Sequence, residues 1–93
     1  MIEFKHVEGK EKGKIKLYAL STCGWCKKTK RLLDSLGIAY DFVNADLVDN
    51  KTSDEIEKEV KKWNPKETYP TIVINSERAI IRYDEDKIKE LAE

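Results

Sequence analysis

Two cysteines separate a strand-like stretch from a helix-like stretch, and this change of pattern is the strongest constraint on the fold. The segment Cys23-Gly24-Trp25-Cys26 holds both cysteines of the chain. Before it, apolar residues alternate along residues 15–20, which predicts a strand. After it, apolar residues gather on one face of residues 27–36 and basic residues on the other, which predicts a helix. The cysteine pair therefore lies at the start of a helix that follows a strand.

A cysteine at the start of a helix differs chemically from a free thiol. The backbone N–H groups of the first turn have no partner within the helix and form the positive end of its dipole. Both features stabilise a thiolate, so we expect Cys23 to carry negative charge more readily than a free cysteine does. The charges of Lys27 and Lys28 should add a modest effect that salt screens. Cys26 is close enough in sequence to close a small ring, which predicts cycling between dithiol and disulfide.

The rest of the pattern predicts an α/β domain with the order βαβαββα. A chain of 93 residues has room for one core. A right-handed crossover makes the first two strands parallel, and a short turn at residues 75–78 makes the last two antiparallel. Residues 2–7 are left open as an edge strand or a mobile arm. We expect strands at 15–20, 38–44, 71–74 and 79–81, helices at 25–36, 52–63 and from 84 onward, an N-terminal extension or edge strand at 1–13, and the domain at 14–93.

Helix start and stop signals support these boundaries. Threonine and aspartate side chains favour the first position of a helix, and a glutamate three residues later completes a capping box. Glycine and proline favour the position after the last turn. The expected caps are Thr22, Thr52 with Glu55, and Asp84, and the expected stops are Gly37 and Asn64-Pro65.

Composition excludes several function classes. The 18 basic and 18 acidic residues balance, so the chain has no overall positive charge for binding nucleic acid. No apolar run approaches the ~18 residues of a membrane span, and the N-terminus lacks a signal-peptide pattern. We therefore expect a cytoplasmic protein that binds neither nucleic acid nor membrane. In a reducing cytosol, an isolated C-x-x-C pair indicates redox chemistry before a structural disulfide.

Three motifs in this order resemble the thioredoxin superfamily and, within it, the glutaredoxins. The chain resembles most the small glutaredoxin-like redoxins of archaea and anaerobic bacteria. The resemblance implies a mixed four-stranded sheet with helices on both faces, to which a short N-terminal strand could add. The matching motifs are YALSTCGWC at 18–26 with the basic KKTKRLL after it, TYPTIVI at 68–74, and IRYDEDKIKEL at 81–91.

The resemblance also assigns roles to individual residues. Cys23 matches the nucleophilic cysteine and Cys26 the resolving cysteine of the family. Pro70 matches the cis-proline beside the active site. The residue before that proline offers its backbone to a bound peptide or glutathione. The expected substrate-binding residues are Trp25, Tyr69, Pro70, Arg82, Tyr83 and Asp84, and no metal ligand is expected.

The chain departs from the usual glutaredoxin pattern at four positions. Gly24 stands where the motif proline is usual and Trp25 where a tyrosine or phenylalanine is usual. Leu20 stands where a lysine is common, and Arg82 where a glycine is typical. Arg82 could bind a carboxylate or block the groove. Because some glutaredoxins without the motif proline hold an iron–sulfur cluster between two subunits, cluster binding is kept as an alternative function.

The leading expectation is a dithiol–disulfide oxidoreductase that reduces protein or small-molecule disulfides. It requires no cofactor, and glutathione or another low-molecular-weight thiol is one candidate reductant. A thioredoxin-type or ferredoxin-linked reductase is another, and the protein is expected to be a monomer. The pair could instead be a structural bridge or a redox sensor without turnover. One C-x-x-C and a single histidine, His6, do not supply the four ligands of a zinc site, so His6 is interpreted as an ordinary strand residue.

Overall fold

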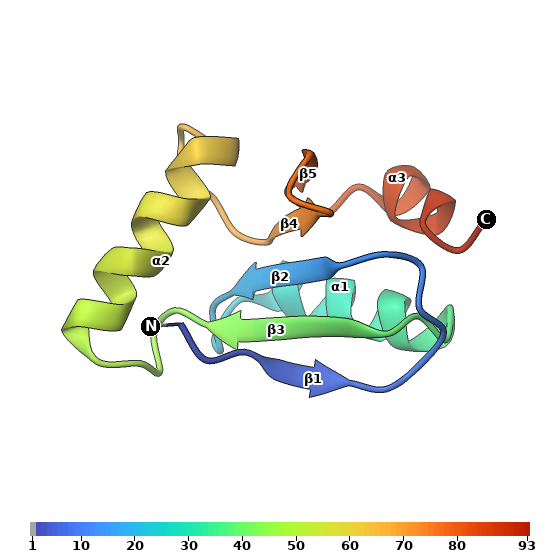
Figure 1. Ribbon diagram of the computed structural model, residues 1–93, viewed down its shortest axis with the longest axis horizontal. Helices are drawn as coiled ribbons and strands as arrows, with labels where there is room; N and C mark the ends of the chain where they lie inside the picture. The colour runs from blue at the N-terminus through green and yellow to red at the C-terminus, as the bar shows by residue number, and fades with distance from the viewer. Residues whose placement is uncertain (1) are drawn as a thin grey trace.

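The computed structural model describes residues 2–93 as one five-stranded mixed sheet with three helices (Figure 1). The strand order is β1-β3-β2-β4-β5, with β2 and β3 parallel and every other neighbouring pair antiparallel. The predicted order and strand directions are therefore confirmed. The elements are β1 (Lys5–Val7), β2 (Ile15–Ala19), α1 (Gly24–Ser35), β3 (Tyr40–Asn44), α2 (Asn50–Trp63), β4 (Thr71–Ile74), β5 (Arg78–Ile81) and α3 (Glu85–Glu90).

The N-terminal segment forms an edge strand, which decides between the two alternatives left open by the sequence. Strand β1 pairs antiparallel with β3, placing Lys5 opposite Phe42 and Val7 opposite Tyr40. It is shorter than the expected 2–7. The sheet accordingly has five strands instead of the four of the core prediction.

Strand β3 begins two residues later than predicted. Residues 38 and 39 instead meet the N-terminal segment. Ala39 donates its N–H to the Lys10 carbonyl at 2.9 Å, and Lys10 forms an isolated bridge with Ile38. Residues 38 and 39, predicted as the start of this strand, instead form a short bridge with Lys10. An apolar pattern alone does not distinguish such a bridge from a strand.

The sheet separates two hydrophobic cores. Alternation along β2 places Leu17 in one core and Tyr18 in the other, and both side chains are buried. Helices α1 and α3 cover the first face, where Leu33 and Ile88 are fully buried, and α2 covers the second. In Figure 1, α1 lies behind β2 and β3. Helices on both faces were predicted and are confirmed.

The helix caps agree with the prediction for the last helix and differ for the first two. Asp84 caps α3, accepting the Lys87 N–H at 3.1 Å. The cap of α1 is Cys23 and not Thr22, because the Cys23 sulfur takes the capping position. The cap of α2 is Asp49 and not Thr52, whose own N–H donates to the Asp49 carboxylate at 2.7 Å.

The helix stops follow the sequence. Gly37 has φ 68°, the left-handed conformation that glycine adopts freely. Helix α2 ends at Trp63 with Asn64 as its C-cap, directly before the proline. None of the three described helices is both long enough and apolar enough to cross a lipid bilayer.

Candidate active site

The sulfur of Cys23 caps helix α1. Its Sγ accepts a hydrogen bond from the Cys26 backbone N–H at 3.2 Å, and the first turn contains no acidic residue. The Cys23 side chain is half-buried, so it remains accessible. Hydrogen bonding to one of the unpaired N–H groups of the first turn favours an anion at this sulfur. The predicted placement of the first cysteine at the helix start is thus confirmed, and it acts as the cap itself.

Cys26 is the buried member of the pair. Its side chain is 1 % exposed and belongs to the core between the sheet and α1. Burial, with a smaller effect of the hydrogen bond to Cys23, raises the pKa of the Cys26 thiol to about 12. A backbone hydrogen bond at Leu20 and the charge of Lys30 act in the opposite direction. Both cysteines are free thiols, and their exposures differ as their predicted roles require.

The loop that joins α2 to β4 lies near the start of α1. The peptide bond between Tyr69 and Pro70 is cis, as the resemblance implied. The carbonyl of Pro70 accepts the backbone N–H of Arg82 at 2.8 Å. This bond joins the loop before β4 to the segment after β5. Tyr69 and Pro70 are thereby placed near Arg82 and Tyr83.

These segments form a groove of about 460 Å³ beside the cysteine pair. Trp25, which stands between the two cysteines in sequence, contributes one wall. The groove contains three aromatic rings and one guanidinium group, a surface that suits an apolar chain with polar ends. Its lining residues are Trp25, Thr68, Tyr69, Pro70, Arg82 and Tyr83.

Trp25 and Tyr83 form a pair that Lys28 joins. The two rings have centroids 5.5 Å apart and planes inclined by 30°. The Lys28 ammonium lies 5.2 Å from each ring centroid, within cation–π range. Trp25 nevertheless remains 59 % exposed. A large aromatic side chain is therefore exposed next to Cys23 in the sequence.

Asp84 is the predicted substrate-binding residue that does not line the groove. Its carboxylate caps α3, where Oδ1 accepts the Lys87 N–H. The sequence had proposed both the cap and a substrate contact for this residue. The structure supports the cap, and the substrate contact stays a prediction.

A buried asparagine that sequence reasoning missed fixes the Pro70 loop. The Asn64 side chain is 2 % exposed, and its Nδ2 lies 3.1 Å from the Thr68 carbonyl, 2.8 Å from the Thr68 Oγ1 and 3.1 Å from the Thr71 Oγ1. The Thr71 hydroxyl also donates to the Thr68 carbonyl at 2.8 Å. These bonds hold the residues on either side of Tyr69 and Pro70. Asn64 was identified only as the end of a helix, since nothing local indicates its partners.

A second missed contact holds the loop before the cysteines. The Asp46 carboxylate accepts the Ser21 N–H at 2.8 Å and also accepts the Ser21 hydroxyl. These bonds lower the pKa of the Asp46 carboxyl. Asp46 follows β3 and Ser21 follows β2, and the parallel pairing brings these strand ends together. Two side-by-side strand ends that terminate in polar residues are the signal that could have identified this pair.

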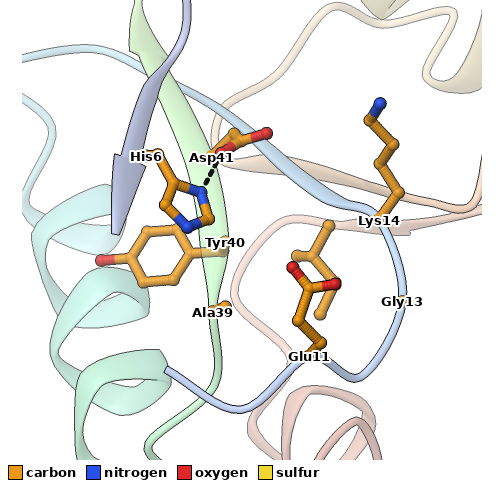
Figure 2. Close-up of a pocket in the computed structure, with 8 residues that line it drawn as sticks. His6, Glu11, Gly13, Lys14, Ala39, Tyr40 and Asp41 are labelled. Carbon is orange, nitrogen blue, oxygen red and sulfur yellow. Dashed lines mark hydrogen bonds and ion pairs between the residues drawn. The ribbon is translucent and has the colours of Figure 1, made fainter. Parts of the chain in front are cut away.

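A separate hollow of about 310 Å³ lies near the starts of β2 and β3, away from the strand ends that lead to the cysteines. Figure 2 shows His6 of β1 pointing at Asp41 of β3, whose carboxylate lies 2.6 Å from the imidazole Nδ1. The two residues are direct cross-strand partners. Within residues 2–93, no group of three or more histidine, cysteine, aspartate or glutamate side chains could hold a metal ion. His6 lies in β1, as interpreted from the sequence, and its imidazole contacts the Asp41 carboxylate.

The family model named Glutaredoxin matches residues 15–79 of this chain. Two solved structures resemble it closely. The glutaredoxin from Methanosarcina mazei Go1 is 44% identical with a TM-score of 0.90, over 96% of this chain and 86% of that one. Methanoredoxin from Methanosarcina acetivorans is 42% identical with a TM-score of 0.87, over 90% of this chain and 88% of that one.

Curated relatives agree with these matches. Glutaredoxin 1 from Rickettsia conorii (strain ATCC VR-613 / Malish 7) is 40% identical over 60 residues, which are 64% of this chain. The chain spans only 56% of the length of that relative. A glutaredoxin-like 8.6 kDa protein in the rubredoxin operon of Clostridium pasteurianum is 34% identical over 79 residues, covering 85% of this chain and 97% of that protein.

Proposed function

Since this chain belongs to the glutaredoxin family, we propose that it is a dithiol–disulfide oxidoreductase that works through Cys23 and Cys26. One observation carries the proposal: the accessible Cys23 sulfur accepts the N–H of Cys26 at 3.2 Å, while the Cys26 thiol is buried beside it. An accessible, anion-stabilised sulfur suits attack on a substrate. A buried thiol next to it suits attack on the intermediate.

In the first step, the Cys23 thiolate attacks one sulfur of a substrate disulfide. A bond forms between Cys23 Sγ and that sulfur, and the other substrate sulfur leaves as a thiolate. The N–H of Cys26 and the positive end of the α1 dipole stabilise the attacking anion before this step. The product is a mixed disulfide between the protein and half of the substrate.

In the second step, Cys26 loses its proton to solvent and attacks Cys23 Sγ. The Cys23–Cys26 disulfide forms, and the remaining substrate sulfur leaves as a thiolate. The substrate disulfide has gained two electrons and the protein dithiol has lost two. Burial raises the pKa of the Cys26 thiol in the reduced protein, so the loss of this proton is part of the second step.

The substrates that suit the groove are disulfide-bonded polypeptides and small disulfides. Three aromatic side chains, Trp25, Tyr69 and Tyr83, provide apolar contact, and Arg82 provides a cation at its rim. The oxidised protein needs a two-electron donor of the thiol or reductase class. Glutathione, another low-molecular-weight thiol, a thioredoxin-type reductase and a ferredoxin-linked reductase are the candidates, in a reducing compartment such as the cytosol.

Two cysteine variants test the proposal. Incubation of Cys26→Ser with a disulfide-bonded peptide should accumulate a one-to-one mixed disulfide on Cys23, visible as a mass increase of half the substrate. Cys23→Ser should turn over no substrate. Any adduct on its remaining Cys26 should form more slowly than the adduct on Cys23 in Cys26→Ser. Preferential adduct formation on Cys26 in the Cys23→Ser protein contradicts the assigned roles.

A donor panel then identifies the reductant. The oxidised protein is offered each candidate separately, and the free thiols that appear are counted with time. The proposed function requires that at least one of these two-electron donors restores both thiols. If no thiol and no reductase restores the two thiols of the oxidised protein, catalytic turnover is contradicted. The result would instead favour a cysteine pair that does not cycle between dithiol and disulfide.

A further inference from the structure

Lys30 occupies a special place among the basic residues of helix α1. It follows Cys26 by four residues, so both side chains lie on the same face of the helix, one turn apart. The neighbouring Lys27, Lys28 and Arg31 are exposed, whereas Lys30 is half-buried. The face it shares with Cys26 is the one that packs on the sheet.

The Lys30 ammonium is held against that sheet by an aromatic ring. Its Nζ lies 3.8 Å from the centroid of Phe42 in β3, a close cation–π contact. Phe42 packs against the same core that contains Cys26. The ammonium group therefore lies between α1 and β3, where water screens its charge less than at the open surface.

Among residues 2–93, Lys30 takes part in none of the ion pairs. The titratable groups that act on it are Cys26 and Asp34 on its own helix and Lys5 on β1. Asp34 accepts the Tyr40 hydroxyl at 3.0 Å. Burial lowers the pKa of Lys30, an anion at Cys26 raises it, and reciprocally the Lys30 charge lowers the pKa of Cys26.

We propose that Lys30 is a positioning residue for the second step of thiol exchange, where its half-buried charge stabilises the Cys26 thiolate as that anion forms. The inference rests on the proposed two-step function. Lys30 keeps its own proton throughout. The proton of Cys26 goes to solvent, the Cys26–Cys23 bond forms, and the substrate sulfur leaves as a thiolate. Attack by Cys23 in the first step does not depend on this charge.

The two steps can be observed separately with an aromatic disulfide such as 5,5′-dithiobis(2-nitrobenzoate). Attack by Cys23 releases the first coloured thiolate, and attack by Cys26 on the mixed disulfide releases the second. In Lys30→Met, whose side chain can still pack on Phe42, the first release should match the wild type. The second should be slower by about threefold, because a pKa rise of about one unit lowers the thiolate fraction about tenfold while the more basic thiolate attacks faster. The pH profile of the second release should move to higher pH.

Two controls separate charge from packing. Lys30→Arg keeps the cation and should restore the second release to within about twofold of the wild type. Arg31→Met removes an exposed cation from the same helix and should leave both releases unchanged. Equal slowing of both releases in Lys30→Met, or an unchanged second release, overturns the role of Lys30. A wild-type protein that releases no coloured thiolate overturns the two-step function and the inference with it.

Discussion

The backbone N–H of Cys26 donates a hydrogen bond to the sulfur of Cys23 across 3.2 Å. The buried residue of the pair thus stabilises an anion on the accessible one, while burial keeps its own thiol protonated. One turn of helix therefore gives two identical side chains different chemistry. The differing exposure, and not the spacing of the cysteines alone, is the ground on which we assign the two proposed steps of exchange.

Replacing Asn64 by alanine should destabilise the fold by about 1–3 kcal/mol, because it removes a buried hydrogen-bond donor. The Asn64 amide is 2 % exposed and bonds to Thr68 and Thr71 on either side of the Pro70 loop. Urea unfolding of the reduced protein measures the difference in free energy.

Ser35→Ala provides the matched control for Asn64→Ala. The Ser35 hydroxyl donates to the Leu32 carbonyl at 2.8 Å but is exposed, so its loss should cost no more than about 0.5 kcal/mol. Equal effects of the two substitutions would show that the Asn64 network does not hold the loop.

The His6–Asp41 pair should make stability depend on pH. The hydrogen bond and charge of Asp41, with smaller effects of Glu8 and Glu11, raise the pKa of His6 above its ordinary value of 6.5. A raised pKa in the folded state means that protonated His6 stabilises the fold. This contribution is complete below about pH 6.5, the unfolded value, and is lost as the pH rises through the folded pKa.

His6 is the single histidine, so its imidazole proton signals can be followed by NMR without ambiguity. The titration midpoint should lie above 6.5 in the wild type and move down in Asp41→Asn. The stability difference between the two proteins should be larger at about pH 6 than at about pH 8. A midpoint that Asp41→Asn leaves in place would contradict the pairing shown in Figure 2.

Replacing Arg82 by glycine should leave stability unchanged or raise it by up to about 1 kcal/mol. Arg82 has φ 65°, a left-handed conformation that costs most residues more than glycine. The greater freedom of glycine in the unfolded chain offsets part of that gain. Thermal or urea unfolding measures the change.

Arg78→Gly tests the same exchange of residues in ordinary backbone. Arg78 is exposed and lies in β5, where glycine should cost about 0.5–1 kcal/mol. If both glycine variants lose the same stability, backbone conformation at residue 82 is not the cause.

Much of the fold could be predicted because its signals are local. The change of apolar period at the cysteines, the continuous β-branched run of β4 and the Asp84 cap each depend on a few neighbouring residues. The wrong caps were also local errors. Thr22 and Thr52 are good capping residues, but each has a competing side chain within three residues, Cys23 and Asp49, that takes the position.

The rest depends on contacts between distant segments. Residues 5–7 form a strand because β3, which pairs with β2 on one side, has its other side available for pairing. The bonds of Asn64 to the Pro70 loop, the contact of Asp46 with Ser21 and the position of Lys30 over Phe42 all require the assembled sheet. The groove residues other than Thr68 were placed through family resemblance, and no pattern in the sequence alone brings Trp25 to Tyr83.

The most direct test of the central claim is the rate at which each cysteine of the reduced protein reacts with iodoacetamide at pH 7, read by peptide mass spectrometry. Cys23→Ser and Cys26→Ser serve as single-thiol controls. The account predicts that Cys23 is labelled faster than free cysteine, because only the thiolate reacts, and that Cys26 stays unlabelled until the pH is strongly alkaline. Labelling of Cys26 first, or of Cys23 no faster than free cysteine, would contradict it.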